Sequence, residues 1–167
     1  TNIRGFATTG NQTLLFDYSK NVFQIDHTKT LRKLAESHPL QHFFSKHQPS
    51  VVKQYKNQLY VGTETQGVFL IDLNGKILRR FDLDEGMQNN NVFDLFLDQS
   101  NNLWLNLDEG IHFFETSSPI TTIGKPQGIT ASIQAIDFES GEPILALNTD
   151  LFLAKNTGGR TQFYNSE

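Results

Sequence analysis

The stretch NVFDLFLDQSNNLWLNLDEGIHFFE, residues 91–115, decides the fold class. Phe93, Leu95 and Leu97 alternate with other residues, and the same alternation returns after a short polar turn, from Leu103 to Leu107. A period of about two residues is typical of half-buried strands joined by tight turns. The stretch is therefore predicted to form three strands of a β-meander.

The unit of strand, polar turn and strand recurs four times along the chain. Its second strand opens at an apolar residue in each copy, with spacings of 46, 43 and 40 residues between Val22, Val68, Ile111 and Leu151. Propeller blades of four strands repeat every 40–50 residues or so, about the same period. We predict an all-β chain of about four four-stranded antiparallel blades that belongs to a larger propeller. The chain is expected to be a single propeller segment over residues 1–167, with blades at 1–49, 50–86, 87–128 and 129–167.

The turns and the alternating positions supply further expectations. Gly67 and Gly110 stand in turns that need a positive φ, and Asn21 and Asp150 are expected to substitute for glycine in the other two copies. The predicted core is Leu15, Val22, Leu59, Val61, Val68, Leu70, Leu95, Leu97, Leu103, Trp104, Leu105, Ile111, Phe113, Ile133, Leu145 and Leu147.

Residues 27–50 form the one long insertion. Leu31, Leu34, Leu40 and Phe44 have helical spacing, but Pro39 interrupts it, so a strand followed by a loop with one or two helical turns is expected there, with almost no helix elsewhere. His38 and His42 have the i, i+4 spacing of paired metal ligands, and the alternative is a solvated polar loop. We favour the loop and expect no metal site.

Composition excludes several classes of function. The chain has 167 residues, 37% of them hydrophobic, and no cysteine, so disulfides, thiol nucleophiles and cysteine-bound zinc are excluded. A formal net charge of -4 predicts no phosphate-binding field, so nucleic acid is not an expected partner. No run approaches the roughly 18 apolar residues of a membrane span, and no signal-like segment follows the first residues. No cofactor and no membrane contact are expected.

Residues 86–115 resemble the two-component regulator propeller repeat. Its pattern is approximately Gly-Leu-x-x-Asn-x-Val, a strand, Asp-x-x-Gly/Asn-Asn-Leu-Trp, a strand, and Asp/Asn-x-Gly-Leu/Ile. The match is full in the third copy, partial in the second, and weak in the first and fourth. The matching residues are Gly86, Asn89, Asn91, Val92, Asp98, Asn102, Leu103, Trp104, Asp108, Gly110 and Ile111.

The resemblance implies a place and a role. Such repeats build propellers in the periplasmic sensory regions of membrane-anchored bacterial regulators, especially hybrid histidine kinases and related transcription regulators of Bacteroidetes type. Its implied partners are further blades and signalling domains of the same chain. The triple-tyrosine immunoglobulin-like module, membrane helix and signalling domain that follow in the family have no counterpart in the sequence, so we expect a fragment or a truncated product.

Residues 98–104 also look like the Asp-box hairpin of sialidases. Its logic is structural: the Asp98 carboxylate accepts backbone N–H groups in the turn and the aromatic residue packs between blades, so Asp98, Asn102, Trp104 and Gly110 are assigned structural roles. The alternative for Trp104 is a stacking platform for a sugar. A sialidase-like enzyme would need clustered arginines and a tyrosine nucleophile, for which the sequence offers no pattern. No catalytic residue is predicted.

Propeller geometry predicts where a ligand would bind. Loops that join the second strand to the third open on the same face as loops that join one blade to the next. We expect a non-catalytic sensor of a small molecule, with an oligosaccharide as the candidate, and a homo-oligomer that covers its terminal blades. The alternatives are a propeller-scaffold glycosidase or lyase fragment and a pure protein-interaction propeller. The candidate ligand residues are Tyr18, Glu64, Gln66, Asn89, Asn90, Asp108, Glu109 and Asn148.

Overall fold

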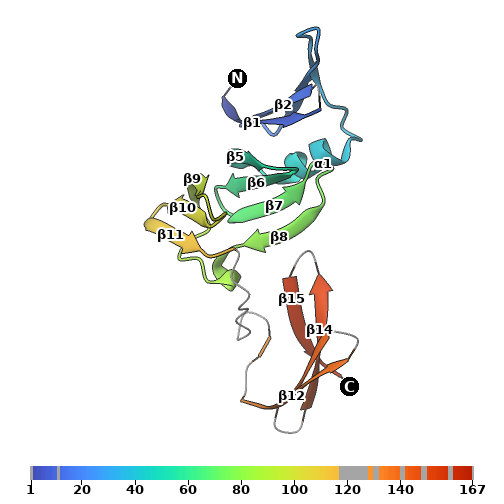
Figure 1. Ribbon diagram of the computed structural model, residues 1–167, viewed down its shortest axis with the longest axis vertical. Helices are drawn as coiled ribbons and strands as arrows, with labels where there is room; N and C mark the ends of the chain where they lie inside the picture. The colour runs from blue at the N-terminus through green and yellow to red at the C-terminus, as the bar shows by residue number, and fades with distance from the viewer. Residues whose placement is uncertain are drawn as a thin grey trace. The chain divides into compact units, whose positions relative to one another are not determined.

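Antiparallel β-sheets make up nearly all of the structure, a computed structural model (Figure 1). It describes residues 2–10, 12–116, 128–129, 132–139, 142–147, 150–157 and 160–166. The chain divides into two compact units, Thr1–Ser118 and Pro119–Glu167. The expectation of one continuous propeller segment, with its blade boundaries, therefore stays a prediction.

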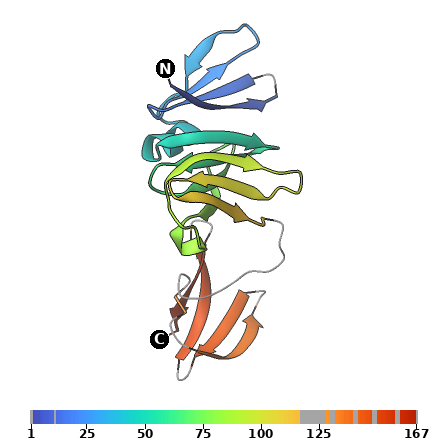
Figure 2. The same ribbon diagram turned by 90° about the vertical axis from the view of Figure 1, so that its left-hand side faces the viewer.

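The first unit contains three sheets whose strands pair with their neighbours in chain order. In Figure 2 these sheets lie one beneath another, in blue, in cyan to green and in yellow. A fourth strand predicted after the third sheet falls on residues 117–127, outside the described residues. The strands are β1 (Ile3–Thr9), β2 (Gln12–Asp17), β3 (Val22–Ile25) and β4 (Leu31–Lys33); β5 (Pro49–Tyr55), β6 (Gln58–Thr63), β7 (Val68–Asp72) and β8 (Ile77–Phe81); and β9 (Val92–Leu97), β10 (Leu103–Leu107) and β11 (Gly110–Phe114).

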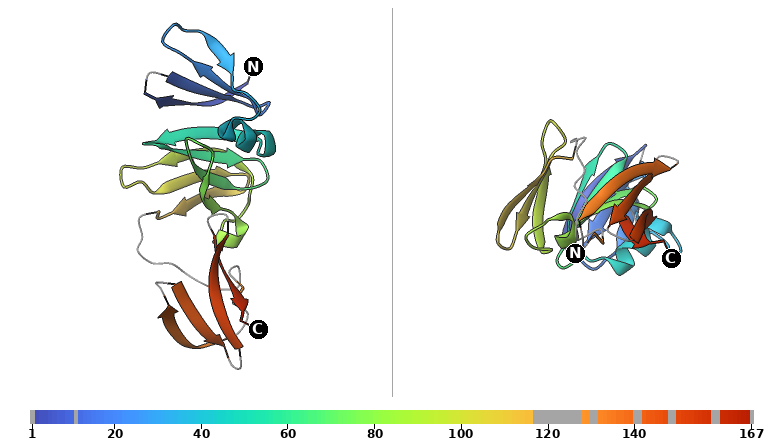
Figure 3. Two further views of the ribbon diagram at one scale, coloured as in Figure 1. Left: turned by 90° about the vertical axis from the view of Figure 1, so that its right-hand side faces the viewer. Right: turned by 90° about the horizontal axis from the view of Figure 1, so that it is seen from below.

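The second unit contains one four-stranded antiparallel sheet, coloured orange to red in Figure 3. Its strands are β12 (Ile133–Glu139), β13 (Glu142–Leu147), β14 (Asp150–Thr157) and β15 (Arg160–Asn165). Leu145, Leu147 and Phe163 form its buried cluster together with Ile129. Four sheets with the strand order of propeller blades confirm the predicted fold class.

First strands bring the sheets of the first unit together. β1 contacts β5, and β9 contacts β5 and β6. Two glycines permit this approach: a Cβ on Gly5 would lie 2.1 Å from the carbonyl oxygen of Val52, and one on Gly62 would lie 2.9 Å from Cγ1 of Val92. Because neither glycine has a side chain, the sheets can pack closely where β1 meets β5 and where β6 meets β9.

The long insertion contains β4 and the helix α1 (Pro39–Lys46), as predicted. Pro39 opens the helix at its first turn, where its missing N–H costs nothing, and His38 caps it by accepting a 3.2 Å hydrogen bond from Leu40 N at Nδ1. Buried Gln41 accepts from Val22 N at 2.9 Å and donates to Lys20 O at 3.0 Å. These bonds fix α1 against the turn between β2 and β3.

Neither α1 nor the short 3-10 helix η1 (Leu83–Glu85) is long and apolar enough to cross a lipid bilayer. These are the helices found within the described ranges. The expectation of almost no helix outside the insertion is confirmed there, since η1 contains only three residues.

The core prediction is right for most positions and wrong for four of them. Trp104, Ile111 and Phe113 are exposed because they lie on the face of β9–β11 opposite the one packed against β5–β8. Ile133 is exposed in β12, a strand whose residues are all exposed. Leu70 and Leu97 are half-buried, and the other ten predicted residues are buried.

The predicted turn conformations are also partly right. Gly67 and Gly110 adopt φ values of +74° and +111°. In the turn between β2 and β3, however, Lys20 rather than Asn21 has a positive φ, of 67°. Asp150 begins β14 and does not have a positive φ. The substitution of Asn21 and Asp150 for glycine is therefore wrong, and in the turn between β2 and β3 the positive φ falls one residue earlier, on Lys20.

Candidate functional site

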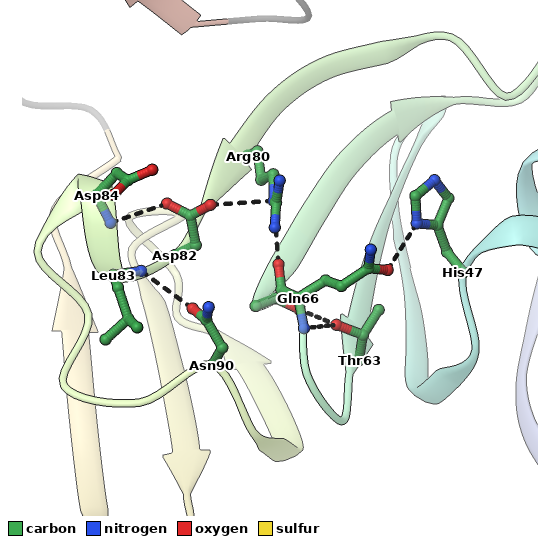
Figure 4. Close-up of polar contacts among 9 residues, drawn as sticks. His47, Thr63, Gln66, Arg80, Asp82, Leu83, Asp84 and Asn90 are labelled. Atoms are coloured by element: carbon green, nitrogen blue, oxygen red, sulfur yellow. Dashed lines mark hydrogen bonds and ion pairs between the residues drawn. The ribbon is translucent and has the colours of Figure 1, made fainter. Parts of the chain in front are cut away.

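Three connections of the first unit meet at the end of the second sheet where β5 and β7 begin and β6 and β8 end. We call this end the loop face; it consists of His47 after α1, the turn 63–67 and the loop 82–91. His47 Nδ1 donates to Gln66 Oε1 over 2.8 Å, and Gly67 N donates to Asn90 O over 3.0 Å. Figure 4 shows these connections side by side. The loops were predicted to open on one face, and these two bonds join the turn 63–67 to both of the other connections.

Arg80 lies at the centre of the loop face. Its Nε is 3.1 Å from Gln66 O and 3.1 Å from Asp82 Oδ2 (Figure 4). Its guanidinium also lies over the ring of Phe69, at 5.0 Å. Asp82 is buried and accepts a 3.1 Å bond from Asp84 N, which caps η1. A largely buried charge needs such partners, so the pair stabilises the loop that follows β8.

Short polar side chains complete the support of the turns. Thr63 is buried, and its hydroxyl donates to Gly67 O at 2.8 Å and accepts from Gln66 N at 3.0 Å. Asn90 Oδ1 accepts from Leu83 N at 3.0 Å. Because these groups satisfy one another, they order the loop face.

The stability of the first unit should fall as the pH is lowered from about 7 to 5. Burial is the main cause that lowers the pKa of His47, with a smaller contribution from the charge of Arg80 and an opposing one from the Gln66 bond. Burial also lowers the pKa of His112. A histidine with a lowered folded-state pKa contributes fully above its unfolded value of about 6.5 and loses that contribution as pH falls toward the folded value.

Urea unfolding, followed by the fluorescence of the single tryptophan, Trp104, measures this dependence in the first unit. The urea concentration at the midpoint of unfolding should decrease as the pH is lowered from 7 to 5. In the His47→Gln variant this decrease should be smaller. A midpoint that stays constant or increases on acidification would contradict the burial of these rings.

The Asp-box hairpin joins β9 to β10. Asp98 Oδ1 accepts from Ser100 N and from Asn102 N, both at 2.9 Å, and Oδ2 accepts from Asn102 Nδ2 and from Trp104 Nε1, both at 3.1 Å. Desolvation acts to raise the pKa of Asp98, but these hydrogen bonds outweigh it and lower the pKa below its ordinary value. The carboxylate therefore stabilises the turn by accepting four hydrogen bonds, one of them from the indole N–H of Trp104. Trp104 is 42% exposed.

The predicted ligand residues are only partly brought together. Gln66 and Asn90 belong to the loop face, and Asn89 supports it by accepting from Asn91 N at 2.8 Å. Glu64 is exposed in the same turn as Gln66, whereas Tyr18 lies under the guanidinium of Arg4 at 4.7 Å. Asp108 and Glu109 are exposed in the turn between β10 and β11, which is not part of the loop face, and Asn148 lies outside the described residues.

A pocket of about 380 Å³ lies beside the loop face, and the sequence predicted only one residue of its lining. The lining is Arg4, Ser50, Glu64, Thr65, Asn91 and Phe93. Arg4, Ser50 and Phe93 lie at the starts of β1, β5 and β9, where the sequence predicted only strand, and Asn91 directly precedes β9. Their common place in the repeat is the signal that could have found them.

One of the two histidines considered as metal ligands and two of the arginines have structural partners. His38 caps α1, and no group of three histidine, aspartate or glutamate side chains gathers as a metal site in the described part of the chain. Arg79 pairs with Glu85 at 3.6 Å, and Arg80 pairs with Asp82. These arginines serve separate contacts rather than one carboxylate-binding cluster.

Comparison with known proteins gives matches in structure. No family model and no curated protein matches the sequence. The extracellular domain assigned to the hybrid two component system BT3049 from B. thetaiotaomicron is similar over 98% of this chain, with 18% sequence identity and a TM-score of 0.56. PorZ, a surface component of the type-IX secretion system of Porphyromonas gingivalis, is similar over 99% of the chain, with 15% identity and a TM-score of 0.52.

The chain spans 22% of the length of the BT3049 structure and 24% of that of PorZ. At these identities the likeness shows the fold. The chain is therefore all-β, its sheets resemble propeller blades, and it is similar in structure to the extracellular propeller region of a Bacteroides two-component sensor.

Proposed function

We propose that the chain is a non-catalytic, ligand-sensing segment from the periplasmic part of a membrane-anchored two-component regulator of the propeller-repeat type. The observation that carries the proposal is the structural similarity to the BT3049 extracellular domain over 98% of the chain. The repeat motif from Gly86 to Ile111 supports it independently, because it lies in the segment that contains β9–β11. The partners are further blades and the signalling domains of the same chain.

The packing of the first unit suggests how a ligand would act. The first strands of three sheets converge, and the pocket beside the loop face has lining residues from all three of them. A ligand that contacts three blades favours one relative position of the blades over others, by as much as its affinities for the two positions differ. That change in packing, passed to a kinase or transcription domain directly or through a homo-oligomer, is the proposed signal.

Purified protein tests the non-catalytic part of the proposal. It should bind an oligosaccharide from a panel of plant and host glycans, measured as a rise in melting temperature, without releasing product from p-nitrophenyl glycosides. Robust hydrolysis that a single carboxylate substitution abolishes would instead support a glycosidase. Absence of any glycan effect, together with capture of a defined protein partner, would support an interaction scaffold.

A further inference from the structure

The first strand of every sheet has a β-bulge at the same position. Pairing with the second strand slips at Arg4 in β1, at Ser50 in β5, at Phe93 in β9 and at Gln134 in β12. These residues are 46, 43 and 41 positions apart, so the bulge repeats with the blades. A bulge leaves one residue out of the ladder and changes the direction of its side chain, and bulges are frequent beside binding sites.

Three of these bulge residues line one pocket. Arg4, Ser50 and Phe93 come from three different sheets of the first unit, yet all border the space of about 380 Å³ beside the loop face, which we call the bulge pocket. Its volume lies in the range of about 300–1,000 Å³ that small-molecule sites occupy. The repeated backbone irregularity therefore presents chemically different side chains to one place.

Buried polar atoms without partners gather at the bulge pocket. Arg4 Nε, Ser50 Oγ and Asn91 Oδ1 are shielded from solvent and have no hydrogen-bond partner, and all three residues line this pocket. The fourth such atom among the described residues, Asn102 Oδ1, belongs to the Asp-box hairpin. Since native proteins pair nearly all their buried polar groups, three unpaired ones in one lining mark this pocket as a place where a small turn of these side chains would bring their polar atoms to a bound molecule.

The donors and acceptors define the chemistry of that molecule. Arg4 lies over the ring of Tyr18 and forms no ion pair with a carboxylate among the described residues. An arginine with open N–H donors is suited to a carboxylate, which it binds through paired hydrogen bonds. Ser50 and Asn91 can bind hydroxyl groups, while Phe93, which is 52% exposed, offers an apolar surface.

We infer that the bulge pocket binds a sugar that carries a carboxylate, such as a uronic acid residue. Arg4 holds the carboxylate, Ser50 and Asn91 bind ring hydroxyls, and Phe93 packs against the apolar face of the sugar ring. Glu64 is exposed at the same pocket. Its carboxylate accepts a hydrogen bond from a hydroxyl group of the sugar. The assignment rests on the proposed function, since it names the ligand class of that sensor.

D-glucuronate and D-glucose test the inference because they differ only in the carboxylate at C6. Titrations of the purified chain followed by NMR should give a dissociation constant about 10-fold lower for glucuronate. Arg4→Gln should abolish this preference, whereas Arg32→Gln, at an exposed arginine of β4, should preserve it. Asn91→Asp should weaken glucuronate binding more than glucose binding, because it places a second negative charge beside the carboxylate.

The melting temperature of each variant shows whether it folds. If Arg4→Gln does not fold, Asn91→Asp tests the inference in its place. Equal affinities for the two sugars, or a preference for glucuronate that survives Arg4→Gln, would overturn the acidic-sugar assignment while leaving the sensor proposal in place. Failure of every glycan in the panel to bind would overturn both.

Discussion

Gly5→Ala should destabilise the first unit by about 3 kcal/mol, at the upper end of the usual cost of overpacking. The added Cβ would lie 2.1 Å from the carbonyl oxygen of Val52 and 2.8 Å from its Cβ. The first obstacle is backbone rather than the end of a flexible side chain, so β1 or β5 must move. Urea unfolding followed by Trp104 fluorescence measures the loss, because the only tryptophan of the chain lies in the same unit.

Two other glycines calibrate this result. Gly62→Ala would meet methyl groups of Val51 and Val92, at 2.7 and 2.9 Å, and should cost less because side chains yield more easily than backbone. At Gly10 no atom lies within 4 Å, so Gly10→Ala reports only the strain of its positive φ, about 1 kcal/mol. A Gly5→Ala variant as stable as Gly10→Ala would contradict the close approach of β1 and β5.

Local patterns predicted the strands well because blades are local structures. Each sheet pairs strands that follow one another, so alternation and turn residues contain nearly all the information needed to identify them. The three strands predicted within residues 91–115 are β9, β10 and β11. The insertion was also predicted correctly in kind, but Pro39 begins α1 rather than interrupting a longer helical pattern.

The exposed face of β9–β11 was not predicted, for a physical reason. Alternation separates the two faces of a strand but does not tell which face a neighbouring sheet covers. Leu103 and Leu105 pack toward β5–β8, while Trp104, between them, faces the other way. A blade in the middle of a propeller has a neighbouring blade on both faces, and the sequence pattern around Trp104 is typical of such a blade. Here the face of β9–β11 that carries Trp104 is exposed.

The site was predicted in part, and the missing part depends on register. Loop residues such as Glu64 can be assigned to a face from topology alone. Arg4, Ser50 and Phe93 reach the bulge pocket because the strand pairing slips at each of them, and a slip is a property of two strands together. Only the alignment of repeats by position would have placed these residues in one set.

Phe44→Ala should cost about 3–5 kcal/mol, which makes it the other large effect expected in this unit. Phe44 is fully buried in α1, where its ring stacks on Phe16 of β2 at 4.8 Å and meets Phe43 edge-on at 5.2 Å. Phe43 in turn contacts Phe69 of β7 at 5.5 Å. The helix thus fills space between the first two sheets, and removal of the ring leaves a cavity that rigid sheets cannot close.

Ser45→Ala is the matched control, since Ser45 is the next residue of the same helix and is exposed. It should change stability by less than about 0.5 kcal/mol, as surface substitutions usually do. If Phe44→Ala lowered the free energy of unfolding no more than Ser45→Ala, α1 would lie on the surface of the first blade without contributing to the core. A full loss would show that the insertion is part of the core, so the widest spacing of the repeats, 46 residues, accommodates a helix that joins two blades.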